Sequence, residues 1–294
     1  MKQTVWSDEP LQDRGLVVTR VHARTDVLKK VSLDRKAIKT LAFRNTDASL
    51  SSLQYDPVEQ TISLYCSAWV HAGNVHWVQP LLTHAVALQA AWGSVIANGR
   101  MSGSFGGQIN ASKPAHGRAR QNKDNMLDII AQVYFPMGLI PPSVTGADYA
   151  QALALVKKLR WIGTASETGF TCEVPPTKQV AATCERTALI QVSSAESHPL
   201  LGNGVFFRLT LPEKLDEALA PRMAIELNRA EITDETGCHH LGAWGVGPAG
   251  LAWVTFLPNA AHGSGLVAAL VQSLAIRANW ARQRLTSLLP ESHQ

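Results

Sequence analysis

The chain has 294 residues, of which 17% are charged, 6% are aromatic and 46% are hydrophobic. This composition is typical of a folded protein with one large or two ordinary domains, and it excludes the fibrous and intrinsically disordered classes. The net charge of +4 is concentrated in one segment, because residues 94–123 carry five basic and no acidic residues and the rest of the chain carries a net −1. A fold whose whole surface is basic and binds nucleic acid is therefore not expected.

The first half of the chain has the hydrophobic periodicity of short strands and two helices. We expect a strand near 15–23, a helix around 33–44, strands near 49–55 and 60–70, and a helix over 78–92. The following segment, 94–123, is rich in Gly, Ser, Asn and Gln and has little to bury. It is therefore predicted to be a flexible basic linker.

The second half predicts the element order α-β-β-β-α-β-β-α. The helices are expected over 147–161, from Glu213 with a kink or break at Pro221, and over 264–284. The strands are expected near 163–175, 187–195, 203–211, 239–246 and 250–257. An additional helix is expected over 124–138. Runs of strands bounded by helices predict antiparallel sheets with helices packed on them, an α+β fold.

The two halves resemble each other when the chain is shifted by 188 residues without a gap. Ala87 then meets Ala275 and Trp92 meets Trp280, and apolar character is kept at helical spacing. This similarity predicts a duplication whose two copies form a pseudo-twofold pair within one chain. Two such chains could also form a dimer. The predicted parts are a shortened first module in 1–93, the linker in 94–123 and a complete second module in 124–294.

The second half also carries a hairpin of the form LGAW…GLAWVTFLPN and a closing helix that contains a Trp near its end. With the element order, this unit resembles the type III secretion chaperone-like superfamily, including its YbjN-like and tandem-module members. The resemblance covers most of 147–294 and, more loosely, about 15–93. It implies small α+β modules that act as dimers, bind other polypeptides and need no cofactor.

Aromatic residues on the two matching strands are the candidate binding residues. Strand alternation places one set of apolar side chains on the core faces and leaves an amphipathic set on the opposite faces. This second set is suited to the interface between modules or to a partner polypeptide, although it is equally compatible with cover by other helices. The candidates are Tyr65, Trp69, Trp253 and Leu257.

Other motifs favour structural interpretations. The sequence GVGPAG, with Gly245, Gly247 and Gly250, matches a dinucleotide fingerprint but is followed by a strand, so a hairpin turn is expected. The histidines and cysteines lack paired ligand spacing, so neither a metal site nor a catalytic residue is expected. The cysteines are predicted to be buried thiols, and Trp92 and Trp280 are predicted to be core anchors.

The sequence thus predicts a non-enzymatic chaperone or adaptor that holds a partner polypeptide on its sheet faces and grooves, without a cofactor. An enzyme with an unrecognised site is one alternative. The other is an adaptor whose linker residues contact nucleic acid or an acidic partner, and these are Lys113, Arg118, Arg120 and Lys123. The first ten residues lack a signal-peptide core, and no apolar run approaches a membrane span, so a cytoplasmic protein is expected.

Overall fold

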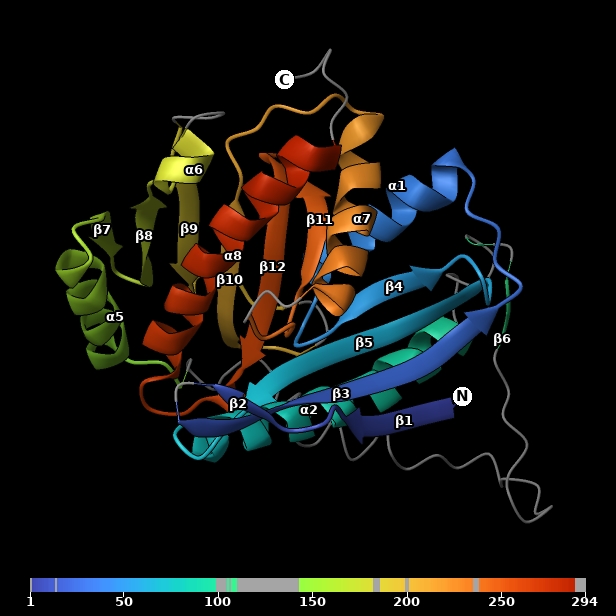
Figure 1. The fold of residues 1–294 in the computed structure, drawn as a ribbon, viewed down its shortest axis with the longest axis horizontal. Helices are drawn as coiled ribbons and strands as arrows, with labels where there is room; N and C mark the ends of the chain where they lie inside the picture. The colour runs from blue at the N-terminus through green and yellow to red at the C-terminus, as the bar shows by residue number, and fades with distance from the viewer. Residues whose placement is uncertain are drawn as a thin grey trace.

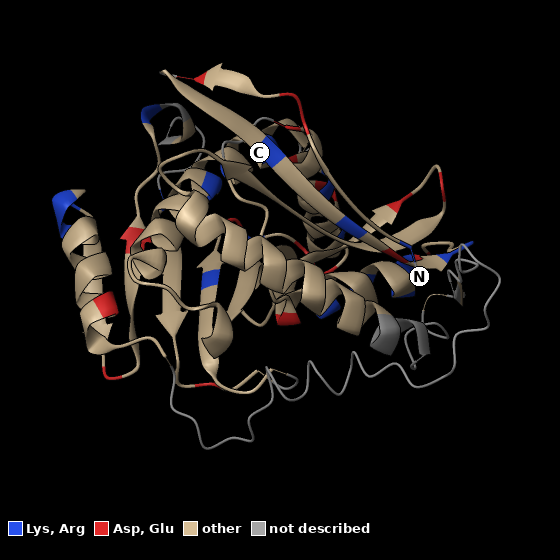
Figure 2. Ribbon diagram, turned by 90° about the horizontal axis from the view of Figure 1, so that it is seen from below, with Lys and Arg blue, Asp and Glu red and all other residues tan. Residues whose placement is uncertain are grey.

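The structure is a computed structural model that describes residues 2–13, 15–98, 105, 107–109, 143–181, 186–198, 201–234 and 238–288. Two antiparallel sheets with helices packed on them give an α+β fold, which confirms the predicted fold class. In Figure 1, one sheet crosses the lower part of the molecule and the other stands above it. Figure 2 shows that basic and acidic residues are interspersed over the described elements.

The first sheet follows the strand order β1-β3-β5-β4, and β2 and β6 also pair with β3. The helix α2 packs on one face of this sheet, against β3 and β5 (Figure 1). The elements of this half are β1 Lys2–Ser7, β2 Leu11–Asp13, β3 Leu16–Lys29, α1 Arg35–Arg44, the 3-10 turn η1 Asn45–Asp47, β4 Ser52–Asp56, β5 Thr61–Val70, α2 Val75–Asn98 and β6 Gln108–Ile109.

The second sheet follows the order β11-β12-β10-β9-β8-β7. The helix α8 crosses in front of it in Figure 1, and α7 lies where the two sheets meet, in contact with β11, β4 and α1. The elements are α5 Gly146–Lys158, β7 Ile162–Ser166, β8 Gly169–Val174, α6 Lys178–Ala181, β9 Ala188–Ser193, β10 Gly204–Thr210, α7 Leu219–Thr233, β11 Ala243–Gly247, β12 Gly250–Pro258, the 3-10 turn η2 Asn259–Ala261 and α8 Leu266–Leu288.

Local chemistry explains where several helices begin. Asp34 caps α1 by accepting a hydrogen bond from the Ala37 amide at 2.7 Å. Asp216 accepts one from the Leu219 amide at 2.6 Å, so α7 begins later than predicted. Pro221 then lies in the first turn of α7, where a missing N–H is tolerated, and the predicted kink at this proline is wrong.

Two other predictions need correction, and one strand was not predicted. The strand predicted over 163–175 is the hairpin of β7 and β8. The strand β1 was missed, because the exposed segment Lys2–Ser7 has no buried face to give it a pattern. Trp92 and Trp280 pack against the core as predicted, but they are only partly buried.

The predicted boundary between the modules does not separate two cores. One hydrophobic cluster includes residues from Ala23 to Leu285 and contains side chains of both sheets. The helix α2 continues to Asn98, so the predicted linker begins within a helix. Phe105 is buried and β6 pairs with β3, so these two parts of the predicted linker are packed on the first sheet. The basic residues proposed for contact, Lys113, Arg118, Arg120 and Lys123, and the helix predicted over 124–138, lie outside the described residues.

The two sheets share the path β4-β5-β3-β1 and β11-β12-β10-β9. The hairpin turns differ, because four residues separate Asp56 from Thr61 and two separate Gly247 from Gly250. A shift of 188 without a gap therefore cannot match both strands of the hairpin. The duplication and its twofold relation stay predictions, and the alignment behind them needs a gap at this turn.

Candidate functional site

The two sheets are joined by backbone hydrogen bonds between their halves of the chain. Ser67 of β5 and His240 exchange both N–H···O bonds, at 3.0 and 2.7 Å. The amide of Phe256 in β12 donates to the carbonyl of Ala48 at 2.9 Å. The segment that precedes β11 therefore bonds to β5 of the first half, and the segment that precedes β4 bonds to β12 of the second half.

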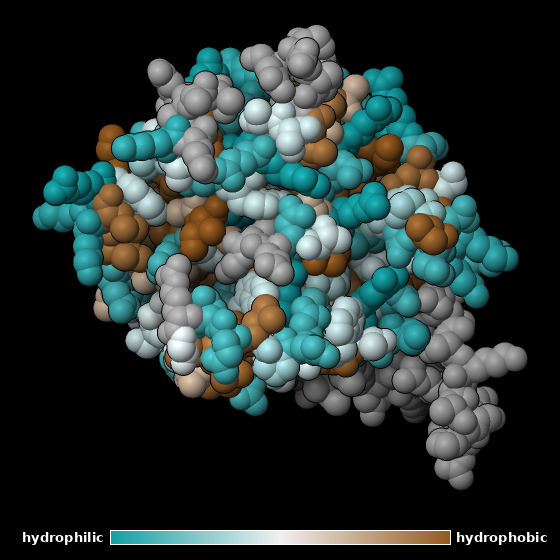
Figure 3. Space-filling model, viewed as in Figure 1, coloured by the Kyte–Doolittle hydropathy of each residue, from teal (hydrophilic) through white to brown (hydrophobic). Residues whose placement is uncertain are grey.

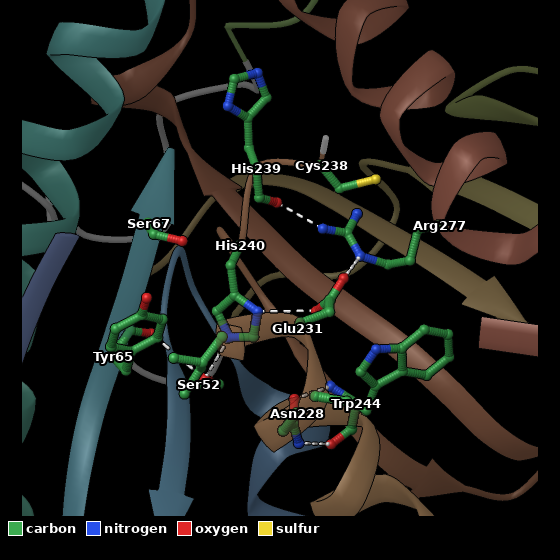
Figure 4. A network of polar contacts seen from close by, with 12 residues as sticks. Ser52, Tyr65, Ser67, Asn228, Glu231, Cys238, His239, His240, Trp244 and Arg277 are labelled. Carbon is green, nitrogen blue, oxygen red and sulfur yellow. Dashed lines mark hydrogen bonds and ion pairs between the residues drawn. The ribbon is translucent and has the colours of Figure 1, made fainter. Parts of the chain in front are cut away.

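A buried charged network fills this junction (Figure 4). Glu231 of α7 accepts from Arg277 Nε of α8 at 2.5 Å and pairs with His240 Nδ1 at 2.9 Å. Arg277 also donates to the carbonyl of His239 at 2.6 Å, and its guanidinium lies 4.1 Å from the ring centroid of Trp253. Glu231, Arg277 and His240 are each 1% exposed, so the network is enclosed.

Ser52 completes a serine–histidine–glutamate series. Its Oγ lies 2.7 Å from His240 Nε2 and accepts a hydrogen bond from the side-chain amide (Nε2) of Gln54 at 2.6 Å. The Glu231 carboxylate only accepts, so His240 Nδ1 carries the proton that it donates to Glu231, and Nε2 of the neutral ring then accepts from Ser52 Oγ, which also lies 3.4 Å from the Tyr65 carbonyl. Hydrolases use a serine, a histidine and a carboxylate in this sequence of contacts, but Ser52 is fully buried and does not line any of three clefts formed by the described residues. The series is therefore a structural network in this conformation.

The charges of this network follow from its burial. Burial by itself raises the pKa of Glu231, but the Arg277 guanidinium and His240 outweigh it and hold this pKa below its usual value. Burial lowers the pKa of His240. At neutral pH the network therefore holds one carboxylate, one guanidinium and a neutral imidazole, a balanced ion pair.

A second buried arginine ties the first sheet to α7. Arg20 of β3 donates to the carbonyls of Glu231 and Ile232, at 2.7 and 3.0 Å, at the C-terminal end of the helix. Its Nε donates to Ser67 Oγ at 3.1 Å. A guanidinium at this position both satisfies the last carbonyls and complements the helix dipole.

Two asparagine side chains close the inner edges of the sheets. Asn228 of α7 donates to the carbonyl of Trp244 in β11 and accepts from its amide, both at 2.7 Å. Asn45 makes the same pair of bonds with Leu53 of β4, at 3.2 and 2.8 Å. Both edge strands therefore have buried backbone groups that only a side-chain amide satisfies.

Replacing Asn228 by alanine should destabilise the protein by about 3 kcal/mol, because the N–H and C=O of Trp244 would both stay buried without a partner. Urea unfolding followed by circular dichroism measures this change. The exposed Arg222 of the same helix provides the control, and its alanine variant should change stability by less than about 0.5 kcal/mol. Equal stabilities for the two variants would contradict the edge-closing role of Asn228.

The face of the first sheet away from α2 is open at a cleft of roughly 400 Å³, which we call the sheet cleft. Strands β1, β3, β5 and β4 form its floor and α7 forms a wall, on the side seen in Figure 1. Figure 3 shows that this side of the molecule has small apolar patches among hydrophilic ones. The lining residues are Trp6, Arg24, Gln54, Tyr55, Asp56, Pro57, Val58, Glu59, Ser63, Tyr65, Arg229, Ile232 and Thr233.

Ring stacking, one hydrogen bond and one close contact to a carboxylate order the aromatic part of the sheet cleft. Trp6 stacks on His22, with ring centroids 4.9 Å apart and the planes 4° from parallel. His22 Nδ1 lies 2.7 Å from the Tyr65 hydroxyl, and His22 Nε2 lies 2.9 Å from Asp8. Burial raises the pKa of Tyr65, so its hydroxyl stays protonated. These contacts hold the two aromatic rings in fixed positions.

The four residues predicted to bind a partner lie in three different environments. Tyr65 is 3% exposed and lines the sheet cleft, and Trp69 lines a second cleft of about 540 Å³ with His71 and His239. Trp253 and Leu257 are each 1% exposed, so a partner polypeptide does not reach them in this conformation, and their alternative role at the interface between modules stays a prediction. Trp253 packs under Arg277 of α8, whereas Tyr65 faces His240 of the other half, so the two strands do not present equivalent faces.

The sequence motifs have the expected local structure. Gly247 pairs with Gly250, which has a φ of +103°, so GVGPAG forms the predicted hairpin turn. Cys66, Cys172 and Cys238 are buried thiols, as predicted for these positions. Within the described ranges, no group of three His, Cys, Asp or Glu residues could hold a metal ion, and no helix is long and apolar enough to cross a membrane.

Comparison of the chain with protein-family models, with curated proteins and with solved structures finds no match in any of the three. The fold and the site define an α+β protein with two antiparallel sheets, a buried ionic junction and an aromatic cleft. The resemblance to type III secretion chaperones stays a prediction.

Proposed function

We propose that the protein binds a short segment of a partner polypeptide in the sheet cleft, as a chaperone or adaptor without catalytic activity. The observation that carries this proposal is the composition of the cleft. It presents Trp6, Tyr65, Arg24 and Arg229 on one concave surface, and Trp, Tyr and Arg are the residue types that dominate binding energy in protein interfaces. Cysteines kept as buried thiols fit a cytoplasmic location, which the proposal includes.

The lining of the sheet cleft suits a polypeptide segment. The indole of Trp6 is 39% exposed and is held in place by stacking, so a partner side chain can pack on it at little entropic cost. Arg229 and Glu59 are exposed charges in the lining, and Gln54 and Ser63 offer hydrogen-bonding groups. An apolar anchor beside polar and charged groups is the usual anatomy of a protein interface.

Site-specific photo-crosslinking tests this proposal. Benzoylphenylalanine in place of Val58, which is 86% exposed and lines the sheet cleft, should crosslink one recurring polypeptide segment in an extract of the source cells. The same group in place of Phe43, which is 59% exposed and outside the cleft, should not crosslink that segment. Failure to recover any polypeptide from the Val58 position would contradict the proposal.

Trp6→Ala should then weaken binding of a synthetic peptide of the crosslinked segment by about 30-fold, the loss expected for a central aromatic anchor. Fluorescence anisotropy of the labelled peptide measures the affinity. Phe43→Ala is the control and should bind like the unaltered protein. If Trp6→Ala keeps full affinity while the protein is folded, the peptide does not occupy the sheet cleft.

A further inference from the structure

Among the described residues, no strand pairs with the outer edge of β1. β1 ends the path of the first sheet, and all six of its residues are exposed, with Val5 at 55% and Trp6 at 39%. Its pairing with β3 is regular from Lys2 to Ser7, without a bulge. The strand contains no proline and only one charged residue, Lys2. Proteins normally block such an edge or pair it with another strand.

The hydrogen-bonding pattern shows which backbone groups face outward. The amide of Asp8 donates to the carbonyl of Arg20 at 2.9 Å, in register with the β1–β3 ladder. Bonded pairs alternate along an antiparallel ladder, so the even-numbered residues of β1 face β3. The N–H and C=O groups of Gln3, Val5 and Ser7 therefore point away from the sheet.

We propose that β1 pairs antiparallel with β1 of a second copy of this chain, across a twofold axis at Val5. Only this register uses all three outward residues of both copies, because Gln3 then pairs with Ser7 of the partner subunit and Val5 pairs with Val5 of the partner subunit. It also places Lys2 opposite Asp8 of the partner subunit, twice by symmetry. Asp8 is half-exposed, so its carboxylate can meet the incoming ammonium group.

Two features favour a second copy of the chain as the partner of β1: the charges are complementary, and the pairing closes the β1 edge of both copies. A twofold pairing leaves neither β1 edge open and joins the two first sheets into one. A register shifted by two residues in either direction loses both Lys2–Asp8 pairs and some of the ladder bonds. The strand β7, which also ends its sheet in the described part of the chain, has the sequence IGTAS without a charged residue, so self-pairing there gains no such charge pairs.

Sedimentation velocity of the full-length protein over a range of concentrations tests this dimer. The unaltered protein should show a concentration-dependent dimer. Val5→Pro removes an outward amide but none of the bonds to β3, and it should shift the protein to monomer, whereas Val5→Ala keeps the amide and should dimerise. A monomer at every concentration, or unchanged dimerisation of a folded Val5→Pro variant, would overturn the proposal.

A charge exchange provides a second test that does not depend on proline. Asp8→Lys alone places like charges opposite each other and should raise the dimer dissociation constant by about tenfold or more. The double variant K2D/D8K restores opposite charges and should recover dimerisation. If the double variant associates no better than Asp8→Lys, the proposed register is wrong. Peptide binding in the sheet cleft is measured separately, so failure of the dimer leaves that proposal standing.

Discussion

Replacing Glu231 by alanine should destabilise the folded protein by about 3–5 kcal/mol, the largest effect that we expect from any single substitution in this chain. The change leaves Arg277 charged and 1% exposed, without the carboxylate that lies 2.5 Å from its Nε. It also removes the partner of His240 Nδ1. Unfolding in urea, followed by tryptophan fluorescence, gives the free energy.

Matched variants separate the buried charge from ordinary truncation. Glu226→Ala removes a partly exposed carboxylate from the same helix and should cost less than about 1 kcal/mol. The double variant E231L/R277M removes both charges and should recover part of the loss, because no unpaired buried charge remains. If the loss of unfolding free energy in E231L/R277M equals the sum of the losses in E231L and R277M, the ion pair does not account for the effect.

The parts of the fold that were predictable from the sequence depend on local patterns. The turn between β11 and β12 was predicted because Gly247 and Gly250 flank it and an apolar strand follows. The α+β class followed from runs of strands between helices. The start of α7 was mispredicted from the local sequence, because the side chain of Asp216 caps this helix and makes it begin later than the sequence pattern indicates.

The buried junction could not be predicted, because its members come from distant segments. Ser52 and His240 are 188 residues apart, and Arg277 lies 46 residues after Glu231. The sequence did contain a weak signal, since Ser52 and Gln54 are polar residues at alternate positions of a buried strand, which implies a polar partner. The identity of that partner depends on tertiary packing.

The expectation that Tyr65 and Trp253 lie on equivalent faces was wrong for a definable reason. The gap-free shift placed Tyr65 and Trp253 at equivalent positions of matching strands. The hairpin turns differ by two residues, so Tyr65 pairs with Ser52 whereas Trp253 pairs with Trp244. Turn lengths that differ by an even number leave the side-chain alternation unchanged, so the different faces mean that this shift is out of register by an odd number of residues, which reverses the face of every side chain.

Acid should destabilise the protein between about pH 7 and pH 4, well before most carboxylates are protonated. Burial lowers the pKa of His239 to about 4, with the charges of Arg277 and His71 adding to the effect. Burial also lowers the pKa of His84, His198 and His240. The unfolded chain binds these protons from about pH 6.5, so it holds more protons than the folded chain, and stability falls as the pH falls.

His239 should account for about 2 kcal/mol of this loss. The full difference between a pKa of about 6.5 and one of about 4 corresponds to about 3 kcal/mol, and partial exposure of the ring reduces it by solvent screening. Protonation at Nδ1 would also break the hydrogen bond that this atom accepts from the Trp69 amide at 3.2 Å. Urea unfolding at several pH values measures the dependence.

His239→Gln should flatten the pH dependence of stability, since the glutamine side chain does not titrate. His76→Gln replaces an exposed histidine in the first turn of α2 and should leave the dependence as it is in the unaltered protein. The comparison isolates His239 because both variants lose one imidazole and only His239 holds the Trp69 amide at the junction between the halves. Parallel stability curves for His239→Gln and the unaltered protein would show that the acid sensitivity arises elsewhere.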